Sequence, residues 1–222
     1  MKNFFLEHTA NGLPIPAYDF GHSGPQVLIL GGVHGDEHEG VEAALGLLRR
    51  WSHSFAFTLK VTLVPALNMD GVLRHERGNG HGVDLNRNMA TNDWSPIIAN
   101  PRYHPGPAAN SEPETRALIA LLERLKPAFI LSLHSWKPML NVNGDCGREA
   151  LAIAQHTGYK IDESIGYPTP GCLGTYCGLE REMPTLTYEI ERGLKTPEIL
   201  RRHVPAIEEA LKVTELTRRK TL

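Results

Sequence analysis

The chain has 222 residues, of which 41% are hydrophobic and 22% are charged, and its formal net charge is −2. This length and composition fit a single globular domain over residues 1–222 with a substantial core. The charge gives no reason to expect nucleic acid or an anionic membrane surface as a partner. The N-terminus is too polar for a signal peptide, and no run of about 18 apolar residues predicts a transmembrane helix. The oligomeric state stays open.

Short apolar runs alternate with segments in which apolar residues recur every three or four positions. In chain order, strands are predicted at residues 27–30, 57–64, 129–133 and 185–190, and helices at residues 41–51, 114–125, 149–156 and 197–216. Strands alternating with helices predict an α/β fold, with a mixed, largely parallel central sheet and helices on both faces. In such sheets the functional crevice lies at the carboxyl ends of the strands.

The ends of two predicted helices carry local signals. Ser111 is expected to cap the helix that begins near residue 114, with Glu114 completing a capping box. The basic run at residues 218–220 is expected to complement the dipole of the last helix.

Two predicted strands end in side chains that suit a metal. The apolar run at residues 27–30 is followed by glycines and then by His34 and Glu37, and the run at 129–133 delivers His134. Histidine and carboxylate ligands suit zinc, and a catalytic zinc site commonly takes three protein ligands and leaves one position for water. The pattern predicts a mononuclear zinc hydrolase, with one Zn²⁺ per chain.

Residues 68–110 form the longest segment without predicted structure, with five glycines, four prolines and seven asparagines. A compact domain seldom carries such a loop without using it. Its first four residues, 68–71, are predicted to form a turn in which Gly71 takes a positive φ. Arginine forks such as Arg77 and Arg87 suit carboxylates and developing oxyanions.

The three cysteines, Cys146, Cys172 and Cys177, are an odd number and do not show the spacing of a zinc site. Together with the absence of a secretory signal, they favour reduced thiols in the cytoplasm. A disulfide between two of them stays an open alternative.

Six motifs, spread over residues 27–193, occur in one order. They are His-x-x-Glu at 34–37, Asn-x-Asp-Gly at 68–71, an arginine at 77, Val-Asp-Leu-Asn-Arg-Asn at 83–88, Leu-His-Ser at 133–135 and a glutamate at 189. In this order they resemble the zinc carboxypeptidase (funnelin) family. Within it, the short chain and the segment at 171–176 are most similar to bacterial murein peptide amidases, which cut γ-D-glutamyl-diaminopimelate in cell-wall peptides.

The resemblance implies a role for each matching residue. It implies zinc ligation by His34, Glu37 and His134, orientation of the first histidine by Asp84, oxyanion stabilisation by Arg77, terminal-carboxylate binding by Asn86 and Arg87, and general base and acid catalysis by Glu189. Tyr176, with Tyr167 behind it, is the candidate for the tyrosine that caps the substrate. Arg74 is a rival to Arg77, and Glu191 is a rival to Glu189.

Three functions fit these residues. The first is a zinc metallocarboxypeptidase or murein peptide amidase of cytoplasmic cell-wall recycling, acting on a small peptide. The second is a zinc deacylase of small N-acyl amino acids, similar to aspartoacylase and succinylglutamate desuccinylase. The third is an inactive zinc-bearing module that binds peptides. A diaminopimelate substrate carries an extra ammonium group, for which Glu180, Glu182 and Asp145 are candidate partners.

Overall fold

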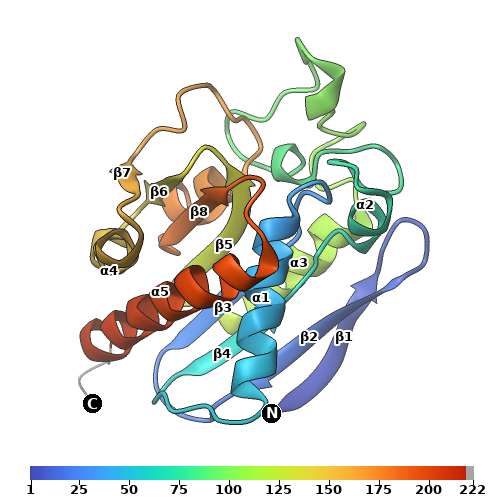
Figure 1. Cartoon of the computed structure of the whole chain (residues 1–222). Coiled ribbons are helices and arrows are strands. Elements are labelled where there is room, and N and C mark those ends of the chain that lie inside the picture. Colours follow the sequence, from blue (N-terminus) through green and yellow to red (C-terminus); the bar gives the residue numbers. More distant parts are fainter. Residues whose placement is uncertain (219–222) are drawn as a thin grey trace.

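The structure, a computed structural model, describes residues 1–218 and is built on one eight-stranded sheet, in the order β1-β2-β4-β3-β5-β8-β6-β7 (Figure 1). The strands are β1 (Lys2–His8), β2 (Pro14–Phe20), β3 (Gln26–Leu30), β4 (Lys60–Val64), β5 (Phe129–Trp136), β6 (Met139–Asn143), β7 (Lys160–Asp162) and β8 (Thr185–Glu191). The four central strands β4, β3, β5 and β8 are parallel to one another, whereas β2 and β6 run antiparallel to them. The predicted mixed, largely parallel sheet is therefore confirmed.

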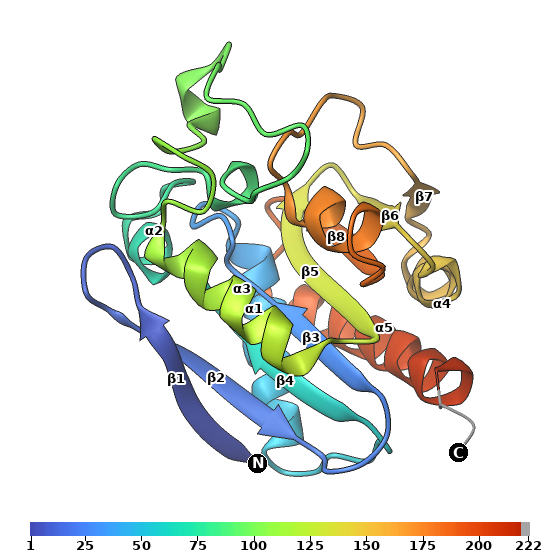
Figure 2. The ribbon, with the colours of Figure 1, turned by 180° about the vertical axis from the view of Figure 1, so that it is seen from behind.

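Helices cover both faces of the sheet. On one face, α1 (His38–Trp51), α4 (Gly147–Thr157) and α5 (Thr196–Thr217) enclose a core with the sheet. On the other face, α3 (Pro113–Leu125) packs over β1 and the central strands, next to the short π-helix η3 (Gly174–Leu179) (Figure 2). The strands between two such layers are buried on both sides, which explains why β3 and β5 read as nearly continuous apolar runs.

The segment at residues 68–110 lies above the carboxyl ends of the central strands (Figure 1). It contains α2 (Met69–Arg74) and the short 3-10 helices η1 (Leu85–Arg87) and η2 (Pro101–Tyr103). Buried asparagines tie it to the rest of the domain: Asn79 Nδ2 donates to carboxylate oxygens of Glu112 and Glu114, at 2.8 and 2.9 Å. This long connection is thus packed against the start of α3.

Two local predictions are wrong. Ser111 does not cap α3: the helix begins at Pro113, and the Ser111 hydroxyl donates instead to a Glu112 carboxylate oxygen at 2.6 Å. Gly71 does not form a turn with positive φ, because it lies inside α2, where its N–H donates to the Asn68 side chain at 2.9 Å. Asn68 is the N-cap of that helix, a role that suits its short acceptor side chain.

The three cysteines are all buried and free. Within residues 1–218, no helix is both long enough and apolar enough to cross a bilayer. The basic run expected to complement the dipole of α5 extends past residue 218 and so lies partly outside the described residues.

Candidate active site

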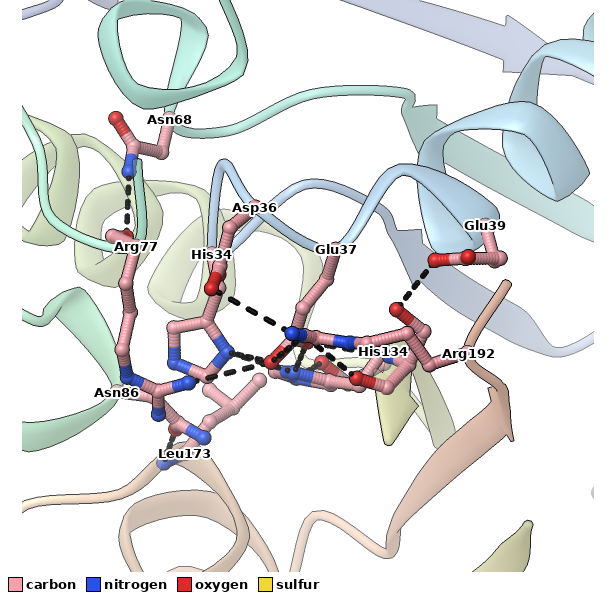
Figure 3. A network of polar contacts seen from close by, with 12 residues as sticks. His34, Asp36, Glu37, Glu39, Asn68, Arg77, Asn86, His134, Leu173 and Arg192 are labelled. Atoms are coloured by element: carbon pink, nitrogen blue, oxygen red, sulfur yellow. Dashed lines mark hydrogen bonds and ion pairs between the residues drawn. The ribbon is translucent and has the colours of Figure 1, made fainter. Parts of the chain in front are cut away.

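Three buried side chains converge at the carboxyl end of the central strands. His34 and Glu37 lie on the connection from β3 to α1, and His134 lies near the end of β5 (Figure 3). The Nδ1 atoms of the two histidines are 3.1 Å apart. Glu37 Oε1 lies 3.0 Å from His34 Nδ1, and Glu37 Oε2 lies 2.8 Å from His134 Nδ1. One ligand atom from each residue lies within 4.8 Å of the other two. The predicted convergence of these residues is confirmed.

The outer nitrogen of each histidine is held by a second side chain. His34 Nε2 lies 3.0 Å from a carboxylate oxygen of Asp84, and His134 Nε2 lies 2.9 Å from the Ser132 hydroxyl. These partners fix both rings so that the Nδ1 atoms face the Glu37 carboxylate. Two imidazole nitrogens and one carboxylate, oriented in this way by outer partners, form a donor set that fits a single zinc ion.

The charges around this cluster stabilise its carboxylates in the ionised form. Burial raises the pKa of Glu37, but the two neighbouring histidines outweigh burial and hold it well below the usual range. Burial likewise raises the pKa of Asp84, and His34 and Arg77 outweigh it, so the Asp84 pKa is also lowered. An ionised carboxylate is the form that binds a cation, so Glu37 is ready to act as a ligand.

Glycine at position 35 allows the metal-ligand segment to lie against the loop that carries Arg77. A Cβ at Gly35 would lie 2.0 Å from the carbonyl carbon of Gly71. The backbone N–H of Gly35 donates to the carbonyl oxygen of Arg77 at 3.4 Å, and the Asn68 side-chain amide donates to the same oxygen at 3.1 Å. These contacts bring Arg77 next to His34.

Arg77 reaches both a metal-ligand residue and its outer partner. Its Nε donates to Asp84 at 2.8 Å, and its Nη1 donates to Glu37 at 3.2 Å. Burial lowers the pKa of Arg77, but the carboxylates of Asp84 and Glu37 outweigh burial and raise it above its usual value. The guanidinium therefore stays charged. The rival Arg74 instead pairs with Glu76 and donates to the carbonyl oxygen of Asn79. Arg77 is therefore the arginine that faces the candidate metal centre.

Asn86 and Arg87 lie beside this centre, on η1. Asn86 Oδ1 accepts from the backbone N–H of Leu173 at 2.8 Å. The backbone N–H of Asn86 donates to a carboxylate oxygen of Asp84 at 2.9 Å. The Arg87 guanidinium lies 5.2 Å from the centre of the Tyr103 ring, as the Arg77 guanidinium does at 5.1 Å. Both residues line the same cavity as the metal cluster.

Glu189 lies opposite His134 in the parallel register of β5 and β8. Its side chain is buried, and its Oε2 atom is one of the buried polar atoms that have no hydrogen-bond partner among residues 1–218. Burial raises the pKa of Glu189 to about 7, with Glu37 adding to the effect and His134 and Arg77 opposing it. The rival Glu191, two residues later, is exposed and does not line the cavity.

The assignment of Tyr176 needs correction, because this residue does not line the cavity. Its ring is buried in the core on the α3 side of the sheet, and the Arg181 guanidinium lies 3.5 Å from the ring centre. The π-helix η3 directs this side chain away from the metal cluster. Tyr167, the second candidate, does line the cavity, with its ring 5.8 Å from that of Trp136.

The cavity contains residues that the sequence did not reveal as site residues. None of Glu180, Glu182 and Asp145, the candidate partners for the ammonium group of diaminopimelate, lines it. Its newly identified lining residues include Arg102, Tyr103, Asn141, Asn143, Thr169, Cys172, Thr187 and Arg192. The sequence held a signal for three of these residues: Thr187 lies on the strand that carries Glu189, Arg192 directly follows that strand, and Cys172 lies in the segment at 171–176. The others come from segments without a matching motif.

Comparison with known proteins decides the family. A family model described as zinc carboxypeptidase matches residues 6–169, well over half of the chain. The chain belongs to the zinc carboxypeptidase family. This membership makes the chain a zinc-dependent hydrolase, and the cluster of His34, Glu37 and His134 is compatible with one zinc site.

Two curated proteins are similar to the chain in sequence. Murein peptide amidase A of Vibrio campbellii is 31% identical over 176 residues, which cover 73% of this chain and 68% of that protein. Murein peptide amidase A of Escherichia coli K12 is 33% identical over 162 residues, which cover 68% of this chain and 65% of that protein. The matched region thus spans about two thirds of the length of these relatives.

One solved structure is similar over nearly the whole chain. The crystal structure of murein-tripeptide amidase from Escherichia coli O157 superposes with a TM-score of 0.79 at 25% identity. The superposition covers 96% of this chain and 92% of that one. The zinc carboxypeptidase fold therefore extends over the described sheet and its flanking helices.

Proposed function

We propose that the chain is a zinc metallocarboxypeptidase that hydrolyses the amide bond between γ-D-glutamate and diaminopimelate in small murein-derived peptides. The observation that carries the proposal is the single cavity that contains His34, Glu37, Arg77, Arg87 and Glu189. The names of the similar proteins, murein peptide amidase and murein-tripeptide amidase, supply the substrate class.

Amide hydrolysis needs an activated water, stabilisation of the developing oxyanion and a proton for the leaving amine. A zinc ion held by His34, Glu37 and His134 would supply Lewis acidity and lower the pKa of water. Glu189 then accepts the proton of the attacking water and returns it to the leaving amine, a role that suits its unpaired Oε2 atom. Arg77 donates to the oxygen that becomes negative as water adds to the carbonyl.

The other end of the cavity would hold the carboxy-terminal residue of the substrate. Asn86 and Arg87 offer an amide and a fixed guanidinium fork to its carboxylate, which is the geometry that favours arginine over lysine. Tyr167 replaces Tyr176 as the candidate for the tyrosine that closes over the substrate, because Tyr167 lines the cavity.

Neutral polar side chains also line the cavity. Asn141 and Asn143 come from β6, Thr187 comes from β8, and Thr169 comes from the loop before η3. Amides and hydroxyls can both donate and accept hydrogen bonds, so this lining suits a side chain that carries an ammonium group and a carboxylate together. Diaminopimelate ends in such a pair of groups.

One experiment separates this function from the deacylase and the inactive binding module. The purified protein, loaded with zinc, is incubated with L-Ala-γ-D-Glu-meso-diaminopimelate and, separately, with N-succinylglutamate, and the products are identified by mass spectrometry. We expect free diaminopimelate from the first substrate and no succinate from the second. Release of succinate alone would support the deacylase, and zinc-dependent peptide binding without cleavage would support the binding module.

The proposal also includes the setting in which the enzyme acts. We place residues 1–222 in one catalytic domain, and the activity in cytoplasmic recycling of cell-wall peptides. Support comes from the single continuous sheet and from the three free cysteines, which are typical of a reducing compartment. Fractionation of cells that make the protein, followed by immunodetection, tests the location.

A further inference from the structure

Two arginines of the cavity have no part in the proposed reaction. Arg102 lies in η2, and Arg192 follows directly on β8. Both approach the same carboxylate: Arg102 Nη2 lies 2.5 Å from Asp36 Oδ2, and Arg192 Nη1 lies 3.7 Å from that oxygen. Segments far apart in the sequence therefore bring two positive charges together at the rim of the cavity.

Arg192 keeps hydrogen-bonding capacity that the protein does not use. Its Nη2 donates to the carbonyl oxygen of Ser135 at 3.0 Å and lies 3.6 Å from a Glu37 oxygen, outside direct hydrogen-bond range. A guanidinium has five N–H donors, and here the described residues fill few of them. Because Glu37 would be committed to the metal, Asp36 is the carboxylate whose ion pairs Arg102 and Arg192 share.

The position of Arg192 relates it to one side of the scissile bond. In Figure 3, Arg77 and Asn86 lie on one side of the metal-ligand residues and Arg192 lies on the other. The backbone N–H of Arg192 donates to the carbonyl oxygen of Trp136, whose side chain also lines the cavity. With the substrate's terminal carboxylate at Asn86 and Arg87, its acyl part runs across the metal centre toward Arg192.

We infer that Arg192, held by its hydrogen bond to the carbonyl oxygen of Ser135, binds a carboxylate on the acyl side of the scissile bond. The inference rests on the proposed function and makes it more specific. A γ-linked glutamyl residue has a free α-carboxylate on the acyl side of the amide that is cut, whereas an α-linked acyl residue with an uncharged side chain has no carboxylate there. Arg192 would therefore select γ-glutamyl acyl groups, with Arg102 adding to the positive charge.

The test compares two peptides that differ in one group. The first is L-Ala-γ-D-Glu-meso-diaminopimelate, and the second carries an α-carboxamide on the glutamyl residue, which removes the negative charge. Hydrogen bonds to charged groups contribute enough to predict a kcat/KM about 10-fold to 100-fold higher for the free acid. In Arg192→Gln this preference should fall to about threefold or less, and Arg192→Lys, which keeps the charge, should recover part of it.

A matched control is Arg201→Gln, which removes an exposed arginine of α5 outside the cavity and should keep the full preference. Equal cleavage of the two peptides by the unmodified enzyme would overturn the inference and leave the proposed function intact. Equal loss of both activities in Arg192→Gln would also overturn it, since that result indicates a structural role. If the zinc-loaded enzyme cut neither peptide, the proposed function itself would fail.

Discussion

Gly40, in the first turn of α1, lies against the carbonyl group of Leu133, so that an added Cβ would lie 2.5 Å from its oxygen. The helix begins directly after Glu37, and Leu133 directly precedes His134. This contact between the Gly40 backbone of α1 and the Leu133 carbonyl of β5 therefore sets how closely the two metal-ligand segments approach each other.

Gly40→Ala should weaken zinc binding, because the new methyl group must push α1 away from β5. Inserting a methyl group into a packed site of this kind costs about 1–3 kcal/mol. We expect a lower free energy of unfolding and at least about a tenfold rise in the dissociation constant for zinc, measured by competition with a chelator. Gly147→Ala is the control, since a Cβ there meets nothing within 4 Å. Unchanged zinc affinity in Gly40→Ala would contradict the prediction.

Glu189→Gln should nearly abolish turnover while zinc stays bound at one ion per chain. The amide keeps the shape of the side chain but cannot accept a proton, and proton transfer by a positioned group commonly contributes at least about a hundredfold to the rate. Zinc content by elemental analysis and kcat on the murein tripeptide check both parts. Glu191→Gln changes the exposed glutamate two residues away and should keep its activity. Wild-type turnover in Glu189→Gln would remove this residue from the mechanism.

Arg77→Gln should lower kcat by about a hundredfold or more, since losing an oxyanion donor costs about 3–4 kcal/mol in comparable sites. The fall should appear mainly in kcat, because the interaction with the oxyanion strengthens in the transition state. Arg74→Gln, which alters an arginine outside the cavity, is the control. A change in KM alone would assign Arg77 to ground-state binding.

The carboxy-terminal group of the substrate should matter through Arg87. Converting the terminal carboxylate of the peptide to an amide should raise KM, because the guanidinium then has no anion to bind. Arg87→Gln should reduce the difference between the two substrates. If the unmodified enzyme cuts free-acid and amidated peptides equally well, Asn86 and Arg87 do not hold the terminus.

The sequence was sufficient for the central strands and for the residues at their ends. β3 and β5 are buried on both faces, so they appear as unbroken apolar runs, and their carboxyl ends had to meet at one edge of the sheet. The residues that follow these two runs, His34, Glu37 and His134, are therefore expected to lie together. The outer strands β1, β2, β6 and β7 were not predicted, because exposed and buried residues mix along them without a long apolar run.

The cavity positions of Tyr167, Arg102 and Arg192 could not be predicted from the local sequence pattern. Tyr167 and Tyr176 both follow the loop motifs, yet Tyr176, within the π-helix η3, is buried in the core, whereas Tyr167, in the loop before η3, lines the cavity. Arg102 and Arg192 lie 90 positions apart in the sequence and meet only through Asp36. Side chains that depend on such tertiary contacts carry no periodic signal.

A buried histidine away from the cavity should make stability depend on pH. His203 on α5 is fully buried, its Nδ1 is hydrogen-bonded to the Tyr188 hydroxyl, and its Nε2 has no partner among residues 1–218. Burial, with a contribution from Arg202, lowers the pKa of His203 to about 4. An unfolded histidine titrates near 6.5, so the unfolded chain binds the additional proton between these two values.

The contribution of neutral His203 to the free energy of unfolding should therefore be fully present above about pH 6.5. It should be lost progressively as the pH falls toward 4. Between pH 7 and pH 5 we expect this group alone to lower the free energy of unfolding by about 1–2 kcal/mol. Urea unfolding of the metal-free protein at both pH values measures the change, and chelation removes the effect of zinc release. His203→Gln keeps a hydrogen-bonding partner for Tyr188 but does not titrate, so its pH dependence over this window should be smaller by the same amount. An equal slope in the two proteins would show that another group titrates there.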